Sequence, residues 1–350
     1  MGAEENLGPE ATARVEIDAM LRGAGWAVQD HSAIALGAAR GVAVREFPMA
    51  QGHGFADYLL FIDRKPVGVL EAKKAGTPLT GVETQSQKYT EGLPAGFNAP
   101  VRPLPFAYES TGDPETRFTN GLDPEPRSRR VFHFHQPGTL QAMLDAHADD
   151  PTKATLNQRL RHHLPPLHDE APWLWTAQRK AVRNLEDSLQ MFRPRALIQM
   201  ATGSGKTYAA ANVAYRLIKE AGAKRILFLV DRSNLGRQAL TEFQQFETPD
   251  DGRKFSELYN VQHLDTNRID DVAKVTISTV QRLYSILRGE ADFDPELEEA
   301  SGSGVAPSRP VEVSYNPDVP IEHFDFIVID ECHRSIYGVW RQVLEYFDAY

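Results

Sequence analysis

The chain has 350 residues, of which 41% are hydrophobic and 25% charged, and its formal net charge is −10. This is the composition of ordinary globular protein, and the length exceeds a typical single hydrophobic core, so we expect two domains. No stretch of 18 apolar residues occurs, which predicts no membrane span. The N-terminus is acidic and polar, unlike a secretion signal, and one cysteine cannot form an intrachain disulfide. We therefore expect a cytoplasmic protein.

The N-terminal segment begins with a predicted amphipathic helix over residues 10–25, which ends at a pair of glycines. A β-hairpin follows. Residues 55–63 are predicted to form its first strand, residues 64–66 the turn, and residues 67–73 the returning strand.

This hairpin is expected to bring Asp57 close to Glu71 and Lys73. Two neighbouring carboxylates form an oxygen-rich site for Mg²⁺, which can bind a scissile phosphate and lower the pKa of a water molecule. Lys73 could stabilise the charge that develops or position that water. A solvated hairpin edge held together by a salt bridge is the alternative interpretation of these three residues.

The next segment is poorer in regular patterns. Residues 93–130 hold many prolines, glycines and charges, which predicts a loop-rich insertion. A last strand is expected at residues 132–134 and a helix at 139–147. Residues 148–172 carry four prolines and are predicted to connect two domains, with a short helix over 153–163.

A glycine-rich stretch, residues 200–207, lies between an apolar run at 196–199 and a helical stretch at 208–219. The sequence therefore predicts a buried strand, a loop and a helix in that order, the setting in which a loop can wrap phosphate groups. Met200 stands where the strict pattern has its first glycine.

The residue types in this loop fit a nucleoside triphosphate. Gly203 and Gly205, with Ser204 between them, let the backbone turn tightly and point its N–H groups inward. Lys206 can reach the β- and γ-phosphates, and Thr207 can offer its hydroxyl to Mg²⁺.

A second element completes this site. Residues 326–329 form an apolar run that predicts a buried strand, and two carboxylates follow it directly. Asp330 can hold the Mg²⁺ shell, and Glu331 can orient or deprotonate the attacking water. From Trp173 onward, apolar strands alternate with helical stretches, which predicts a parallel sheet covered on both faces.

The two nucleotide motifs resemble the first and second motifs of superfamily 2 helicases and translocases. Gln178 stands where that family has a glutamine that reads adenine, and a carboxamide can pair with adenine N6 and N7. Two further predicted strands, 226–230 and 275–280, end in polar groups that could grip a phosphate backbone without reading sequence. The resemblance implies DNA contacts from Arg232, Ser278, Thr279 and Gln281.

The hairpin resembles the core of PD-(D/E)xK nucleases, in which Asp57 and Glu71 would be metal ligands and Lys73 the catalytic lysine. Gln85 and Tyr89 match a Gln-x-x-x-Tyr pattern of one branch of that superfamily and would support the site or contact DNA. An acidic residue of the first helix joins some such sites. Glu16 is the candidate, although an exposed helix charge is the favoured interpretation.

A nuclease joined to a superfamily 2 motor resembles the R subunit of type I restriction enzymes, as does the stretch at 330–350, including 334–340. The resemblance implies an α/β fold: a PD-(D/E)xK endonuclease domain at 1–147, a linker at 148–172 and a RecA-like lobe at 173–350. A surface loop is expected at 289–318. A second RecA-like lobe would be absent, so this chain is expected to bind ATP without translocating.

The implied function is ATP-dependent translocation along double-stranded DNA, coupled to Mg²⁺-dependent endonucleolytic cleavage. The acidic net charge of −10 predicts only weak, nonspecific DNA binding by this chain alone. The resemblance implies that partner subunits, a methyltransferase subunit and a specificity subunit, supply the sequence recognition. Two alternatives stay open. One is another helicase–nuclease of DNA repair or stand-alone phage defence, and the other is a nonenzymatic ATP-dependent DNA-binding scaffold.

Overall fold

The structure is a computed structural model, and it describes residues 9–79, 83–113, 115–168, 171–294, 298, 312–332 and 339–350. The chain divides into two compact units, residues 1–155 and 156–350. The division falls after Thr155, inside the range 148–172 that the sequence predicts as a linker. Most of the predicted loop at 289–318 and most of the stretch at 334–340 lie outside the described residues.

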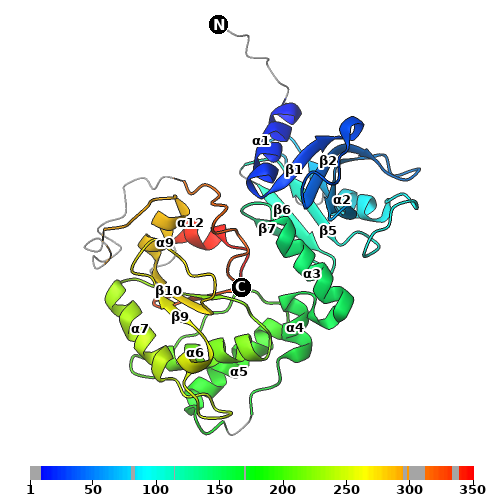
Figure 1. The fold of residues 1–350 in the computed structure, drawn as a ribbon. Coiled ribbons are helices and arrows are strands. Elements are labelled where there is room, and N and C mark those ends of the chain that lie inside the picture. The colour runs from blue at the N-terminus through cyan, green and yellow to red at the C-terminus, as the bar shows by residue number, and fades with distance from the viewer. Residues whose placement is uncertain are drawn as a thin grey trace. The chain divides into compact units, whose positions relative to one another are not determined.

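The first unit is built on one seven-stranded mixed sheet with strand order β1-β2-β3-β4-β5-β6-β7. Figure 1 labels β1, β2, β5, β6 and β7 among its strands. The β1–β2 and β4–β5 pairs are parallel, and the other four pairs are antiparallel. Its strands are β1 (Trp26–Asp30), β2 (Gly41–Pro48), β3 (Phe55–Ile62), β4 (Lys65–Ala72), β5 (Phe106–Ser110), β6 (Thr116–Asn120) and β7 (Arg129–Val131). Its helices are α1 (Pro9–Gly23), α2 (Glu83–Glu91) and α3 (Pro137–Asp149), with short 3-10 turns at His31–Ala33 and Pro151–Lys153.

Helix α1 confirms the predicted first helix. Ala13, Ile17 and Leu21 are buried at a spacing of four residues, so they form the stripe that packs on the sheet. Helix α2 packs against β4 and β5. The core beside it consists of apolar side chains from β2, β3 and β4, among them Val44, Leu59 and Val69. The predicted hairpin is also confirmed, as β3 and β4, but its turn lies at residues 63–64 instead of the predicted 64–66, because Ile62 already pairs with Lys65.

The prediction of a loop-rich insertion at 93–130 is wrong, because β5, β6 and most of β7 lie there. Every residue of β5 is buried, so this strand runs through the middle of the sheet. The prolines and glycines that suggested a loop occupy the connections between the strands. The prediction of a strand at 132–134 is wrong as well, since β7, the last strand of this unit, ends at Val131. The helix expected at 139–147 is confirmed by α3.

The second unit has a four-stranded, fully parallel sheet with order β11-β8-β10-β9. Figure 1 labels its strands β9 and β10. Its strands are β8 (Ile226–Val230), β9 (Val261–His263), β10 (Val275–Thr279) and β11 (Phe326–Ile329). Its helices are α4 (Leu156–His163), α5 (Thr176–Gln190), α6 (Lys206–Lys219), α7 (Ser233–Gln245), α8 (Phe255–Leu258), α9 (Val280–Leu287) and α12 (Val339–Tyr346). The predicted α/β class with a parallel sheet is confirmed, and the central strands β8 and β10 are buried throughout.

The strand predicted at 196–199 is not formed. Residues 193–200 carry no regular structure, and the Leu197 and Ile198 side chains are 79% and 41% exposed. A strand needs a partner for its backbone groups. The edge strand β11 takes another partner: Ile327 N donates to Tyr350 O (2.8 Å), and Tyr350 N donates to Asp325 O (3.0 Å). The apolar run therefore precedes the glycine-rich loop as an exposed, unpaired segment.

Candidate active sites

The β3–β4 hairpin places Asp57 beside Glu71. Its two-residue turn, Asp63 and Arg64, has positive φ at both positions (46° and 68°), as in the tight turns that match the twist of antiparallel strands. The paired ladder ends at Tyr58 with Leu70, and one more step in the same register sets Asp57 opposite Glu71. The Asp57 carboxylate lies close enough to raise the pKa of Glu71. The predicted meeting of these carboxylates therefore follows from strand register alone.

Glu71 is almost fully buried, with 4% of its surface exposed. Its Oε1 accepts a hydrogen bond from the Lys73 ammonium (2.7 Å), whereas its Oε2 has no hydrogen-bond partner in the described part of the chain. Burial raises the pKa of the Glu71 carboxyl to about 7, Lys73 acts to lower it, and the nearby Asp57 carboxylate adds to the rise. A buried carboxylate oxygen without a partner is costly unless a cation or proton satisfies it.

Asp57 is held from two sides. Its Oδ2 accepts from the Ala72 backbone N–H (2.9 Å), and its Oδ1 accepts from Arg14 on α1 (2.6 Å). Arg14 also donates to Glu46 of β2 (2.8 Å). The sequence analysis missed Arg14 and Glu46, since no local pattern connects a helix residue to a strand more than thirty residues away.

Helix α2 carries the predicted supporting residues. Tyr89 is half-buried and packs on the β2–β4 core, whereas the Gln85 side chain lies outside what the structure describes. Ser86, between them, donates its hydroxyl to the fully buried carboxylate of Glu109. Glu109 pairs with Glu71 in the parallel β4–β5 register. Ser86 and Glu109 thus connect α2 to the strand next to Glu71, and the sequence analysis missed both.

The remaining acidic candidate stays outside this group. Glu16 is exposed and lies beside Gly112, as expected of an ordinary helix charge. Across the described residues, no group of three or more His, Cys, Asp or Glu side chains is arranged to hold a metal ion. A Mg²⁺ site here would draw on two carboxylates, Asp57 and Glu71, with water or substrate oxygens completing its shell. The unpartnered Glu71 Oε2 fits such a cation.

The glycine-rich loop of the second unit adopts the predicted turn. Gly203 and Gly205 have φ of +77° and +73°, a backbone conformation that other residues rarely adopt. Ser204 closes the turn by donating its N–H (3.2 Å) and its hydroxyl (2.6 Å) to Ala201 O. Helix α6 begins directly at Lys206, so its N-terminal N–H groups and positive dipole end follow the loop. This geometry fits bound phosphate.

Gln178 lies against this loop from the start of α5. Its Oε1 accepts from Trp175 N (2.9 Å), and its Nε2 donates to Ser204 O (3.1 Å) and Gly205 O (3.2 Å). A Cβ atom at Gly205 would come within 2.3 Å of that Nε2, so glycine is required there by space as well as by φ. Gln178 is 3% exposed, and its amide braces the loop in this structure. Adenine recognition by Gln178 stays a prediction.

The two nucleotide motifs meet through an ion pair. Lys206 Nζ lies 3.1 Å from Glu331 Oε1, although the two residues are 125 positions apart. The hydrogen bond that Lys206 donates to the Glu331 carboxylate raises the pKa of Lys206. Asp330 continues the sheet by donating its N–H to Leu229 O (2.9 Å), and Thr207 is half-buried in the first turn of α6. Lys206, Thr207, Asp330 and Glu331 therefore gather at the carboxyl end of β11.

The predicted DNA contacts differ in their exposure. Arg232 precedes α7 with a 40% exposed side chain. Ser278 and Thr279 are buried, and Gln281 is half-buried. Thr279 caps α9, and its hydroxyl lies 2.7 Å from Glu298 Oε1.

Glu298 also forms a two-point ion pair with Arg282, at 2.8 Å and 2.6 Å, and both side chains are buried. Glu298 therefore ties the loop predicted over 289–318 to α9, and Asn316 ties it there as well by donating its amide to Ile286 O (3.0 Å). Ser278 and Thr279 present no exposed donor in this conformation, so contact of either with DNA stays a prediction.

A family model described as Type III restriction enzyme, res subunit, matches residues 174–350, which contain both nucleotide motifs. The chain belongs to this family. A second model, described as the second domain of the type I restriction enzyme EcoKI endonuclease subunit, matches residues 32–102 and so includes the β3–β4 hairpin.

Curated relatives extend this likeness over most of the chain. The EcoKI endonuclease subunit of Escherichia coli K12 is 27% identical over 97% of this chain, and the EcoAI endonuclease subunit of Escherichia coli is 27% identical over 81% of it. A type I endonuclease subunit of Staphylococcus aureus COL is 24% identical over 83%. The resemblance to type I restriction R subunits is confirmed. The chain spans about a third (32%) of the length of the first two relatives.

None of the described helices combines the length and the apolar character that spanning a membrane requires.

Proposed function

We propose that this chain is the part of a type I restriction R subunit that carries the endonuclease centre and the first ATP-binding lobe. The observation that carries the proposal is the approach of Asp57 to Glu71 across one hairpin, with Lys73 on Glu71. The same chain carries a glycine-rich loop whose following residue, Lys206, pairs with Glu331. In the whole protein, ATP-driven translocation would bring double-stranded DNA to the hairpin site. Methyltransferase and specificity subunits would supply sequence recognition.

At the hairpin, Asp57 and Glu71 would hold Mg²⁺, which supplies Lewis-acid activation of a phosphodiester and of a water. The Ala72 N–H fixes the rotamer of Asp57 by binding Oδ2. Lys73 lies on the Glu71 carboxylate, where its ammonium can stabilise negative charge that develops on the phosphate. Ser86 and Glu109 hold α2 beside the same strands and act as positioning residues.

At the glycine loop, the backbone N–H groups and the start of α6 would bind the phosphates of ATP. Lys206, paired with Glu331 in the free chain, would move its ammonium to the β- and γ-phosphates. That movement would free the Glu331 carboxylate to orient the attacking water. Asp330 and Thr207 would hold Mg²⁺.

Two lysine substitutions test the assignment in the assembled enzyme. Lys73→Ala is expected to abolish DNA cleavage and leave DNA-stimulated ATP hydrolysis intact, whereas Lys206→Ala is expected to abolish both. The matched controls are Lys74→Ala and Lys224→Ala, which remove exposed lysines of the same two units. Normal cleavage by Lys73→Ala would refute the nuclease assignment. Purified residues 1–350 should show ATP hydrolysis near background with or without DNA.

A nonenzymatic DNA-binding scaffold is the second candidate, and one observation favours it: both hairpin carboxylates already pair with cations, Asp57 with Arg14 and Glu71 with Lys73. If these pairs are only structural, the chain binds neither Mg²⁺ nor Mn²⁺ at the hairpin. Isothermal titration with Mn²⁺, repeated on Asp57→Asn, separates the two functions.

A further inference from the structure

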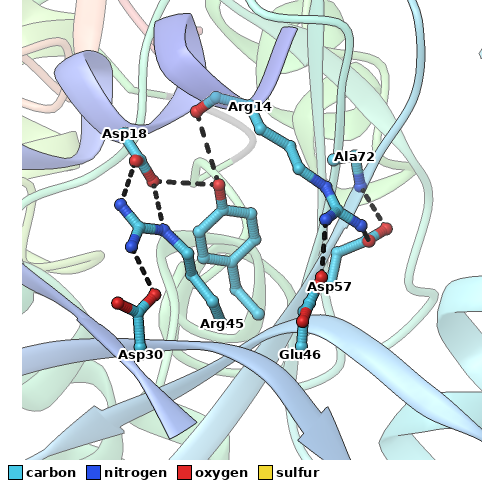
Figure 2. Close-up of polar contacts among 8 residues, drawn as sticks. Arg14, Asp18, Asp30, Arg45, Glu46, Asp57 and Ala72 are labelled. Carbon is cyan, nitrogen blue, oxygen red and sulfur yellow. Dashed lines mark hydrogen bonds and ion pairs between the residues drawn. The ribbon is translucent and has the colours of Figure 1, made fainter. Parts of the chain in front are cut away.

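Arg14 connects helix α1 to the proposed metal site. Its guanidinium donates to Asp57 Oδ1 at 2.6 Å and to Glu46 Oε1 at 2.8 Å, and Figure 2 shows it lying between these two carboxylates. The Arg14 side chain is 40% exposed, that of Glu46 68%, and that of Asp57 16%. The arginine therefore reaches from the solvent side to the more buried of its two partners.

The helix does not need Arg14 in order to dock. One turn further along α1, Asp18 accepts from Tyr58 (2.9 Å) and from Arg45, and Arg45 continues to Asp30 (2.6 Å), as Figure 2 also shows. Tyr58 also donates to the backbone oxygen of Arg14 (3.5 Å). Together with the apolar stripe of α1, these contacts fix the helix on β2 and β3 without the Arg14 side chain. The Arg14 side-chain contacts are therefore additional to those that hold the helix in place.

Glu46 occupies an unusual backbone position. It lies in β2 across from Asp57, because Arg45 pairs with Tyr58 and Phe47 with Ala56 on either side. Its φ is +49°, which is strained for a residue with a side chain. Strain of this kind collects at functional sites, where the surrounding structure enforces it. The result is that a second carboxylate stands within reach of the arginine that binds Asp57.

Arg14 and a divalent cation would compete for one atom. Asp57 Oδ2 already accepts a hydrogen bond from the Ala72 N–H, and Arg14 donates to Oδ1, so a metal ion that binds Oδ1 displaces the guanidinium from that oxygen. A guanidinium at 2.6 Å also repels a second cation through like charge. Arg14 also donates to the Glu46 carboxylate, so its guanidinium keeps an anionic partner when it leaves Asp57.

We propose that Arg14 is a gate on the nuclease centre: it holds Asp57 in a metal-free ion pair, and it shifts onto Glu46 when a divalent cation binds. The inference rests on the proposed function, because it takes Asp57 to be a metal ligand. The gate predicts opposite effects for two substitutions. Removing the Arg14 charge raises the affinity of Asp57 for the metal, and removing the Glu46 carboxylate lowers that affinity.

Mn²⁺ binding to the purified 350-residue chain tests this, measured by isothermal titration and by the loss of the free-Mn²⁺ electron paramagnetic resonance signal. Arg14→Gln is expected to bind Mn²⁺ more tightly by roughly tenfold, because a competing cation is gone. Glu46→Gln is expected to bind several-fold more weakly. Arg14→Lys, whose single ammonium cannot bridge both carboxylates as a guanidinium does, should fall between wild type and Arg14→Gln.

The matched control is Arg22→Gln. It removes the same charge from the same helix but from a side chain that lies 3.7 Å from Asp18 rather than on Asp57. It should leave Mn²⁺ affinity unchanged. The melting temperature of Arg14→Gln should stay close to that of wild type, because the Asp18 network docks the helix without it.

The possible results distinguish the gate from the proposed nuclease function on which it rests. If Asp57→Asn abolishes Mn²⁺ binding and Arg14→Gln leaves it unchanged or weaker, the gate is wrong and the metal site stands. If neither wild type nor Arg14→Gln binds Mn²⁺ at millimolar concentration, the metal site and the gate both fall. The gate is supported if Arg14→Gln binds Mn²⁺ more tightly, if adding Asp57→Asn cancels that gain, and if Arg22→Gln leaves the affinity unchanged.

Discussion

The two candidate centres of this chain are built in different ways. At the proposed nuclease centre, Asp57 and Glu71 lie 14 positions apart, and the register of one hairpin brings them together. At the nucleotide site, Lys206 and Glu331 lie 125 positions apart and meet only because β11 joins the parallel sheet. Glu71 is 4% exposed, whereas the Lys206 side chain is 36% exposed.

The difference shows that the sequence separation of its residues decides how much of the fold a site depends on. Antiparallel register is a local property, so the hairpin pairs its carboxylates as soon as its two strands form. A parallel sheet assembles from distant segments, so the nucleotide site depends on packing throughout the second unit. Substitutions that disturb long-range packing should therefore destabilise the second unit most. In the first unit, the spacing of residues within the hairpin should decide the geometry of the site.

The largest effect is expected from breaking the buried Arg282–Glu298 pair. Arg282→Ala leaves Glu298 as a buried charge without its partner, which should cost the second unit about 3–5 kcal/mol. Urea denaturation measures the loss, and peptide-resolved hydrogen exchange should locate it in β10 and α9. The control is Arg341→Ala, which breaks an exposed pair with Glu345 and should cost under about 1 kcal/mol. Equal effects of the two substitutions would contradict the prediction.

Acidification should weaken the second unit through His323, which is 4% exposed. Burial lowers its pKa to about 4, Arg225 adds to the decrease, and Asp271 opposes it. The native state therefore stays neutral while the unfolded chain takes up a proton below pH ~6.5, so stability is lost as pH falls from about 6.5 to about 4.

The loss through His323 should be on the order of 2–3 kcal/mol. Urea midpoints measured across this pH window should flatten in His323→Gln and keep their slope in His162→Gln, which replaces an exposed histidine of the same unit. An unchanged slope in His323→Gln would assign the acid sensitivity to other groups.

The close approach of β4 and β5 gives the corresponding test in the first unit. A Cβ atom at Gly68 would lie 2.5 Å from Phe106 O, so Gly68→Ala should push apart the two strands that carry Glu71 and Glu109. The expected cost is about 1–3 kcal/mol, with weaker Mn²⁺ binding at the hairpin. Gly96→Ala is the control, because a Cβ atom there meets nothing within 4 Å. Thermal unfolding of both variants shows whether β4 and β5 can move apart without a loss of stability.

The smallest effect is expected at the exposed run before the glycine loop. Leu197→Asn should change the stability of the 350-residue chain by less than about 0.5 kcal/mol, because this side chain is 79% exposed. Leu227→Ala, in the fully buried strand β8, should cost about 2–5 kcal/mol. A comparable loss from Leu197→Asn would mean that residues 196–199 are buried in solution.

The amino-acid sequence by itself determined the features that depend on local pattern. Strands β8 and β11 begin and end where their apolar runs do, the hairpin turn falls at Asp63 and Arg64, and Gly203 and Gly205 take the positive φ that a phosphate-binding turn requires. These features follow from side-chain periodicity and backbone chemistry within a few residues. That is why the α/β class, the Asp57–Glu71 pairing and the glycine loop could be predicted.

Tertiary structure alone decided which groups meet across long stretches of chain. It made β5 a buried central strand despite the proline-rich sequence around it, and it left the apolar run 196–199 without a sheet partner. It also buried Thr279 beneath Glu298 and placed Arg14 on Asp57. Each outcome depends on which partner satisfies a backbone edge or a charge, and that partner lies beyond the reach of any local pattern.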